Sequence, residues 1–392
     1  MSSRADGSRP VRVIVTGGGT GGHVYPALTT VNALREVLAA EGRELSVTWV
    51  GAHGKLEERI AGEHGIPFLP VATGKLRRAR NPLGMLTWTN IRDLARVPWG
   101  AVQACGIVRR LKPDAVVGFG GYVAVPVSVA AWLCHRPLVI HEQTVRLGLA
   151  NRILARLAKA TAVSSESTLG LLPGRTRSRA ELVGNPVRAE LFGGDADRAV
   201  AALGLDGFDR SLPTVYVTGG ALGARQINNL TVESLPWLLK QANVVHQCGA
   251  AEIDRMREAA AALSPELAPR YHVAEFIGAE LPDLFALADL VVARSGAGTI
   301  SELSALGKPA ILIPLASSAG GEQAFNARYL DERGAARALL GEVSGEDLRA
   351  AIGALLEDPA ARAAMADHAR ELGRPEAART LSALILRVAG AQ

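Results

Sequence analysis

The sequence has few cysteines and few aromatic side chains, and each shortage excludes a class of protein. Its 392 residues include three cysteines, Cys105, Cys134 and Cys248, at spacings that suit neither a metal site nor a disulfide framework. We therefore expect reduced thiols. Aromatic residues make up 4% of the chain, against 42 glycines. Glycine-rich turns, rather than aromatic cages, should shape the binding sites.

Long hydrophobic runs are also missing. The most apolar stretch, 122–134, is interrupted by Pro126 and Ser128, and it falls short of the roughly 20 residues that a membrane-spanning helix needs. The first ten residues are polar and include Arg4 and Arg9, which is not the pattern of a signal peptide. We expect a soluble or peripherally bound protein rather than an integral one.

Charge of one sign is only mildly in excess. Lysine and arginine number 43 against 38 aspartates and glutamates, a formal net charge of +5. This balance suits anionic ligands or an anionic membrane surface, but it does not indicate a nucleic-acid partner, and we expect none. Hydrophobic residues account for 48% of the chain and charged residues for 21%, which is typical of a globular protein and excludes a disordered one.

Length and an internal repeat predict two domains. Single hydrophobic cores stop growing at roughly 250–300 residues. A β-branched run at 11–15 leads into a glycine loop at 16–22, and further apolar runs alternate with helical segments. Val-Thr-Gly-Gly occurs at 15–18 and again at 217–220, each time between an expected strand and an expected helix. The sequence therefore predicts an α/β protein with two doubly wound, mainly parallel sheets.

The domain boundary is expected between residues 184 and 209. We place the first domain at 11–188 and the second at 210–374. The last segment, 375–392, contains an amphipathic helical pattern, and we expect that helix to pack back on the first domain.

The first glycine loop indicates a phosphate site. Gly17, Gly19 and Gly22 have the G-x-G-x-x-G spacing after a strand, which allows backbone N–H groups to approach a phosphate at a helix N-terminus. The alternative is a tight structural turn. A dinucleotide site also needs an acidic residue at the end of the second strand, but residues 49–53 contain none and the first carboxylate is Glu57. NAD binding is therefore disfavoured.

His23 closes this loop, at the expected start of a helix. The helix dipole disfavours an imidazolium there, so the ring should be neutral and able to accept a proton from an attacking hydroxyl. A histidine that only caps the helix is an equally supported alternative.

A second strand, turn and helix occur late in the chain. Residues 290–293 precede Arg294-Ser-Gly-Ala-Gly-Thr-Ile-Ser-Glu302. The turn again offers N–H groups to a diphosphate, and Glu302 can accept two hydrogen bonds from a ribose diol, or it can simply favour the helix start. Downstream, Gln323 and its polar neighbours at 322–327 can reach sugar hydroxyls or act as ordinary helix-start residues.

Five motifs, in one order and spacing, resemble the MurG family of UDP-N-acetylglucosamine transferases. They lie at 18–23 (GGTGGH), 118–122 (GFGGY), 141–143 (HEQ), 184–188 (GNPVR) and 294–302 (RSG to Glu302). Each motif alone is loose, but the ordered set is specific, and the resemblance extends from about residue 11 to about residue 378. It implies GT-B architecture, with two Rossmann-like doubly wound domains and a cleft between them. It also implies an inverting transferase that needs neither metal nor cofactor.

The resemblance implies a reaction and its partners. The enzyme would transfer GlcNAc from UDP-GlcNAc to undecaprenyl-diphosphate-MurNAc-pentapeptide (lipid I) and so make lipid II for peptidoglycan. It would act as a peripheral protein at the cytoplasmic face of the bacterial cell membrane. The alternatives are a related transferase with another lipid or natural-product acceptor, and a nucleotide-sugar-binding protein without catalysis.

The resemblance also assigns site residues by position. His23, Tyr122 and Glu142 would face the acceptor or the reacting centre, with His23 as base or acceptor orienter. The residues implied for UDP-GlcNAc are Thr20, Gly21, Gly22, Thr144, Arg188, Ala221, Ile277, Ala297, Gly298, Thr299, Ile300, Ser301, Glu302 and Gln323.

Three positions depart from the family pattern. Thr144 stands where the family usually has Asn, Ala221 where it usually has Ser, and Glu322 where it usually has His or Gln. A hydrogen bond to a charged group is worth ~1.5–3 kcal/mol. These differences should retune donor binding without abolishing it.

A basic segment with apolar and indole groups is the candidate membrane-facing surface. Each Lys or Arg near an anionic surface contributes about 1 kcal/mol of attraction, and tryptophan favours the interface. Composition alone slightly favours a solvated loop over a membrane-facing surface. If the acceptor is linked to a lipid, the membrane-facing surface is favoured instead. The residues are Lys75, Arg77, Arg78, Arg80, Leu83, Leu86 and Trp88.

Overall fold

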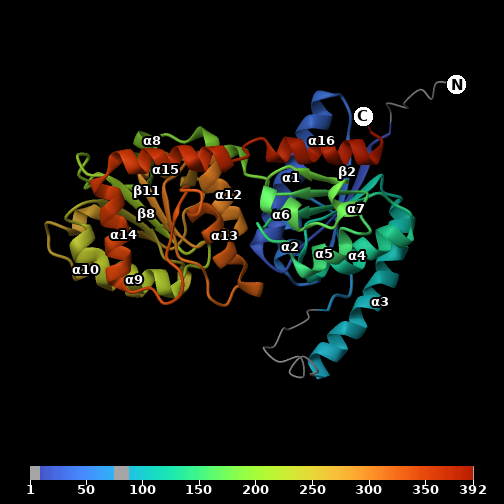
Figure 1. Ribbon diagram of the computed structural model, residues 1–392, viewed down its shortest axis with the longest axis horizontal. Helices are drawn as coiled ribbons and strands as arrows, with labels where there is room; N and C mark the ends of the chain where they lie inside the picture. The colour runs from blue at the N-terminus through green and yellow to red at the C-terminus, as the bar shows by residue number, and fades with distance from the viewer. Residues whose placement is uncertain (1–8, 75–87, 392) are drawn as a thin grey trace. The chain divides into compact units, whose positions relative to one another are not determined.

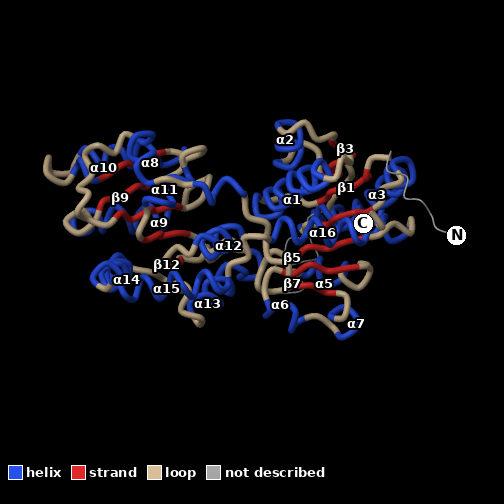
Figure 2. The backbone as a smooth tube through the Cα atoms, turned by 90° about the horizontal axis from the view of Figure 1, so that it is seen from above, coloured by secondary structure: helices blue, strands red, loops and turns tan. Residues whose placement is uncertain are grey.

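The computed structural model describes the backbone of residues 9–74 and 88–391 (Figure 1). Each half of the chain contains one parallel sheet with helices packed against it. Figure 2 shows the strands of each half as a row between helices. The α/β class and the two Rossmann-like, doubly wound sheets are thereby confirmed.

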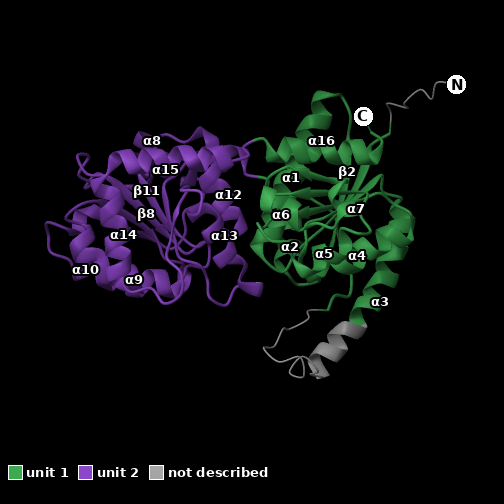
Figure 3. Cartoon of the chain, in the orientation of Figure 1, with its two compact units in different colours: residues 1–186, 376–392 green, residues 187–375 purple. Residues whose placement is uncertain are grey.

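The chain divides into two compact units (Figure 3). Unit 1 comprises residues 1–186 and 376–392, and unit 2 comprises residues 187–375. The predicted domains, 11–188 and 210–374, left residues 189–209 unassigned. In the structure, 187–209 belong to unit 2, because Asp283 accepts hydrogen bonds from the Asp195 backbone N–H (2.9 Å) and the Arg198 guanidinium Nε (2.7 Å).

Unit 1 is built on a seven-stranded sheet in the order β3-β2-β1-β4-β5-β6-β7, in which every pairing is parallel. The strands are β1 (Val11–Thr16), β2 (Leu45–Gly51), β3 (Phe68–Pro70), β4 (Ala115–Gly118), β5 (Leu138–Glu142), β6 (Ala160–Val163) and β7 (Ala180–Leu182). The helices are α1 (Gly21–Ala40), α2 (Leu56–Glu63), α3 (Trp88–Leu111), α4 (Gly121–Leu133), α5 (Leu149–Leu154), α6 (Glu166–Leu171), α7 (Gly174–Arg177) and α16 (Ala377–Ala389).

The core of unit 1 lies on both faces of its sheet, because strand side chains alternate in direction. Val13 and Val15 of β1 pack in a cluster with α1 and α16, whereas Ile14 packs in a second cluster with α3 and α4. Helix α16 contacts α1, and the two lie side by side in Figure 1. The C-terminal helix thus completes the core of the first sheet.

Unit 2 is built on a six-stranded parallel sheet in the order β10-β9-β8-β11-β12-β13. The strands are β8 (Thr214–Thr218), β9 (Asn243–Gln247), β10 (Tyr271–Ala274), β11 (Leu290–Ala293), β12 (Ala310–Leu312) and β13 (Arg337–Ala338). The helices are α8 (Ala196–Leu203), α9 (Arg225–Leu238), α10 (Ile253–Ala261), α11 (Leu281–Leu287), α12 (Ala297–Leu306), α13 (Glu322–Asp331), α14 (Gly345–Glu357) and α15 (Pro359–Leu372).

Each sheet changes winding direction at one place, between β1 and β4 in unit 1 and between β8 and β11 in unit 2. The connections that leave the carboxyl ends of these neighbouring strands diverge, and ligands of open α/β sheets bind in the crevice that results. In unit 1 the loops concerned are 17–20 and 119–120, and in unit 2 they are 219–224 and 294–296. The predicted phosphate loops occupy these positions.

Within the described part of the chain, no helix combines the length and the apolar character needed to cross a membrane.

Candidate functional site

The crevice of unit 1 is lined by two glycine loops that touch each other. Gly19 has φ +84°, and a Cβ there would lie 3.0 Å from the Tyr122 ring. Gly121 has φ +75°, and its Cβ would lie 2.6 Å from the Gly18 carbonyl oxygen. Only glycine tolerates both the positive φ and the close approach. The loops therefore bring Tyr122, on the first turn of α4, next to the phosphate loop that leads to His23.

His23 lies in the first turn of α1, partly buried, with Nδ1 3.2 Å from the Gln143 Oε1 atom. Burial lowers the pKa of its imidazole, and the negative charge of Glu142 and the Gln143 hydrogen bond oppose that shift only in part. The ring is therefore neutral at neutral pH. This is the protonation state that a proton acceptor requires.

Glu142 ends β5 and is 3% exposed. Its carboxylate accepts hydrogen bonds from the Thr144 N–H (3.1 Å) and hydroxyl (2.8 Å), the Gly148 N–H (2.9 Å) and the Asn151 amide (3.0 Å). Four donors hold it in place, so Glu142 shapes the loop at 144–151 and acts on His23 through its charge. The Thr144 hydroxyl therefore donates to this carboxylate.

Glu57 is a site residue that the sequence analysis treated only as a missing ribose ligand. It is fully buried on α2, and its carboxylate accepts hydrogen bonds from the backbone N–H groups of Gly19 (3.2 Å) and Ala52 (3.3 Å). A Cβ at Gly18 would lie 2.3 Å from its carboxyl carbon. Glu57 therefore positions the first glycine loop. Its place in the first helical turn after the second strand was the available signal.

In unit 2 the structure brings Arg188 and Glu302 together. The Arg188 guanidinium lies 3.1 Å from Glu302 Oε1, and the Glu302 side chain is 22% exposed. Burial raises the pKa of Glu302, and the Arg188 charge and hydrogen bond act in the opposite direction. The pair places a carboxylate and a cation beside the start of α12, which is where a nucleoside diphosphate was predicted to bind.

The N-terminus of α12 begins after Gly296, which has no side chain to cap the helix. The first N–H groups of a helix lack partners within it and suit an anion. Gly298 and Thr299 lie in this first turn. Ile300 is buried, and the Ser301 hydroxyl donates to the Ala297 carbonyl (2.8 Å). The first side chain therefore packs inside the unit, and the second makes a hydrogen bond within α12.

Three predicted donor residues lie in unit 1, with Thr20 at the N-cap of α1 and Gly21 and Gly22 in its first turn. Three others lie in unit 2, two of them on loops and one at the start of a helix. Gln323, on the first turn of α13, accepts a hydrogen bond through Oε1 from the Leu315 N–H (2.9 Å). Ala221 is exposed in the loop after β8. Ile277 is buried, and its N–H donates to Gln247 Oε1 (2.9 Å). Their contacts with donor remain predictions.

Gln247 is a second residue that the sequence analysis missed. It ends β9 and is buried, and its amide Nε2 donates to the Gly220 carbonyl (3.0 Å) and the Thr218 hydroxyl (3.3 Å). One amide thus ties the second glycine loop to Ile277. A polar residue at the carboxyl end of an apolar strand was the signal.

The predictions of a membrane-facing segment and of metal independence are not tested by the hydrogen bonds described above. Lys75, Arg77, Arg78, Arg80, Leu83 and Leu86 lie outside the described residues, and Trp88 is described only as the backbone start of α3. The described residues contain no group of three or more His, Cys, Asp or Glu side chains placed to hold a metal. Metal independence stays a prediction.

Comparison with known proteins places both units in one family of sequences. Residues 13–163 match the glycosyltransferase family 28 N-terminal domain, and residues 214–381 match the glycosyltransferase family 28 C-terminal domain. The UDP-N-acetylglucosamine–N-acetylmuramyl-(pentapeptide) pyrophosphoryl-undecaprenol N-acetylglucosamine transferase of Treponema denticola is 36% identical over 342 residues, covering 84% of each chain. Its namesake from Treponema pallidum (strain Nichols) is 38% identical over 325 residues, covering 83% of this chain and 81% of that one.

Among solved structures, the crystal structure of Acinetobacter baumannii MurG is similar with a TM-score of 0.73 and 27% identity, covering 96% of this chain and 100% of that one. The UDP-GlcNAc 2-epimerase of Neisseria meningitidis, bound to UDP-GlcNAc, shares the fold at a TM-score of 0.65 and 14% identity, covering 96% of this chain and 99% of that one.

Proposed function

The chain belongs to the MurG family of UDP-N-acetylglucosamine transferases, and from that premise we propose how its own residues serve the family's reaction. It is a UDP-GlcNAc-dependent glycosyltransferase that transfers GlcNAc to lipid I and so makes lipid II for peptidoglycan. The observation that carries this function is 35–38% identity to such transferases over most of both chains.

Our mechanism has one chemical step. The C4 hydroxyl of the acceptor's MurNAc attacks the anomeric carbon of GlcNAc from the face opposite to UDP. The bond between that carbon and the diphosphate oxygen breaks, and its electron pair leaves with UDP, giving a β-1,4 link with inversion. The hydroxyl proton passes to the neutral imidazole of His23. The lowered pKa of this partly buried ring supports this assignment.

The donor is proposed to bind unit 2 through its diphosphate and its ribose. The first turn of α12 offers N–H groups and the positive end of a helix dipole to the diphosphate, which gains charge as the bond breaks. Glu302 accepts hydrogen bonds from the ribose diol. Arg188, 3.1 Å away, opposes the rise in pKa that burial causes and so favours the ionised form of Glu302, which accepts hydrogen bonds.

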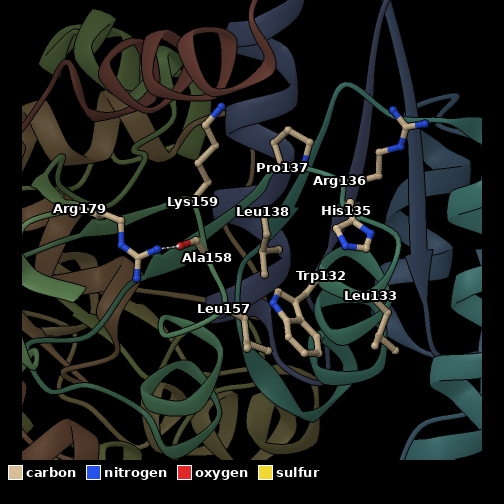
Figure 4. Close-up of a pocket in the computed structure, with 10 residues that line it drawn as sticks. All are labelled: Trp132, Leu133, His135, Arg136, Pro137, Leu138, Leu157, Ala158, Lys159 and Arg179. Carbon is tan, nitrogen blue, oxygen red and sulfur yellow. Dashed lines mark hydrogen bonds between the residues drawn. The ribbon is translucent and has the colours of Figure 1, made fainter. Parts of the chain in front are cut away.

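The enzyme is proposed to act at the cytoplasmic face of the membrane, bound peripherally. Support in the described residues comes from the end of α4, where Trp132 and Leu133 are 50% and 48% exposed. They border a cavity of about 590 Å³ that Arg136, Lys159 and Arg179 also line (Figure 4). None of its ten lining residues is acidic.

The charge of this surface is not compensated by the hydrogen bonds that the structure shows. Lys159 donates to the Val388 carbonyl (3.3 Å) and Arg179 to the Ala158 carbonyl (2.9 Å), and a carbonyl has no net charge. Basic groups beside an exposed indole are the combination that favours an anionic lipid interface.

Turnover of radiolabelled UDP-GlcNAc tests the function directly. Label should appear in lipid II when lipid I is supplied in vesicles, and soluble aglycones should accept none. Transfer only to another lipid or to an aglycone would favour the alternative acceptors. UDP-GlcNAc binding without any transfer would favour a binding protein.

A further inference from the structure

A continuous run of hydrogen bonds leads from a backbone carbonyl to His23. It begins at His141, whose Nε2 lies 2.8 Å from the Gly184 carbonyl oxygen. A carbonyl only accepts, so the hydrogen is on Nε2 of His141. This ring is fully buried, and burial lowers its pKa to about 4. It is therefore neutral, and its Nδ1 holds a lone pair without a hydrogen.

Gln143 is the next member, and both ends of its amide are assigned by their neighbours. Nε2 lies 3.1 Å from Nδ1 of His141 and 2.6 Å from the Phe119 carbonyl oxygen. Both of these atoms are acceptors, so the amide must present its NH₂ to them. Its Oε1 consequently faces His23, 3.2 Å from Nδ1. The orientation of the amide follows from the network.

The nitrogen of His23 that carries the hydrogen is identified in the same way. Oε1 of Gln143 can only accept, so Nδ1 of His23 carries the hydrogen. Because burial lowers the pKa of this ring, it holds one proton at neutral pH. Nε2 is therefore the nitrogen with the lone pair.

We propose that Gly184, His141 and Gln143 form a relay that fixes His23 in its Nδ1–H tautomer and so presents Nε2 as the proton acceptor. His141 and Gln143 are positioning residues, since they act through His23. The use of that tautomer in catalysis rests on the proposed function. The tautomer itself is a property of the resting protein.

Other ionisable groups also face His23. The carboxylates of Glu142 on β5 and Glu57 on α2 favour its protonated form. His141 carries no charge at neutral pH, and the phenol of Tyr122 lies on α4. The two carboxylates bias how readily His23 is protonated, but a charge does not choose between nitrogens. Two acceptors do, because the His23 ring also interacts with the Phe119 backbone carbonyl. The contact whose nitrogen is identified is that of Nδ1 with Gln143 Oε1.

Nitrogen-15 NMR of the full chain, labelled in histidine, tests the tautomer without any turnover. The His23 signals, identified as those lost in His23→Ala, should show a protonated Nδ1 and an unprotonated Nε2 at neutral pH. In Gln143→Leu, which removes the amide, they should shift toward a mixture of tautomers. A protonated Nε2 in the unaltered protein, or an unchanged spectrum in Gln143→Leu, would overturn the relay.

The pH profile of kcat/KM tests its use in catalysis. In Gln143→Glu a carboxylate lies against Nδ1 of His23, so the pKa of that ring rises. A protonated base cannot accept a proton, so kcat/KM falls below the pKa of His23. This acid limb of the profile should therefore move to higher pH, by roughly 1–3 units for a charge at this distance.

Asn228→Asp is the matched control, because Asn228 Oδ1 lies 3.1 Å from Nε2 of another buried histidine, His246, within unit 2. It should leave the acid limb in place. If the tautomer is as expected but Gln143→Glu does not move the limb, His23 is not the base, and that part of the proposed function fails.

Discussion

At the residue scale, Glu302 shows how burial and one charged neighbour act on the pKa of a carboxyl. Burial raises that pKa, and Arg188 opposes the rise in part. If Glu302 holds the ribose diol, Glu302→Ala should raise the UDP dissociation constant at least tenfold, or ~1.4 kcal/mol. Titration calorimetry measures this. Glu266→Ala, which removes an exposed carboxylate of the same unit, should leave affinity unchanged, and equal affinity in both variants would contradict the assignment.

The same pair predicts a pH dependence. The pKa of Glu302 lies above its ordinary value, and a protonated carboxyl loses part of its acceptor capacity. UDP affinity should therefore be full above that pKa and fall as the pH drops through it. Arg188→Met removes the opposing charge, so the pKa rises further and the loss should begin at higher pH. Calorimetry across the pH range gives UDP affinity against pH for the unaltered protein and for Arg188→Met. If the two proteins lose affinity at the same pH, Arg188 does not affect the pKa of Glu302.

At the element scale, α16 shows how a segment distant in sequence completes the hydrophobic core on one face of a sheet. Leu381 and Ile385 are fully buried in the cluster that α16 forms with α1 and the first sheet. Leu381→Ala should destabilise unit 1 by about 2–5 kcal/mol, as expected for a buried leucine. Urea unfolding measures the change, with Ala383→Ser on the exposed side of the helix as control. UDP affinity should persist in both, and its parallel loss would place α16 in the donor site.

At the scale of the whole molecule, the proposed mechanism requires the lipid-linked acceptor to stay in the bilayer while its sugar reaches His23. Replacing Arg77, Arg78 and Arg80 together by Ala should remove about 3 kcal/mol of attraction to anionic vesicles, since each contributes about 1. Vesicle sedimentation should show weaker binding, and activity on embedded acceptor should fall. UDP binding and activity on a short-chain soluble acceptor should remain near normal; equal loss on both acceptors would end the membrane interpretation.

Metal independence is a prediction about the whole reaction. Helix N-termini and Arg188 are proposed to take the charge of the departing diphosphate, which a divalent ion neutralises in other transferases. Activity should therefore survive EDTA. Inactivation by EDTA with recovery on adding magnesium or manganese would show that a metal supplies this charge.

The sequence by itself determined the two parallel sheets and the positions of their glycine loops, because strand periodicity and loop glycines are local properties. The strands at 11–16 and 214–218 and the loops that follow them lie where their patterns predicted. It also supplied the candidate residues His23 and Glu302, because each lies on a helix that follows a glycine-containing turn visible in the sequence.

Only the tertiary structure decided how those residues are held. The contacts of His23 with Gln143, of Gly19 with Glu57 and of Arg188 with Glu302 join positions 120, 38 and 114 residues apart. No local pattern encodes such pairs. The first two contacts form because parallel strands align their carboxyl ends at one edge of a sheet, where residues distant in sequence meet. Arg188 follows β7 of the first sheet and Glu302 lies on α12 after β11 of the second, so their contact depends on the path of the chain into unit 2. The proposed tautomer of His23 and the opposition of Arg188 to the raised pKa of Glu302 rest on these contacts.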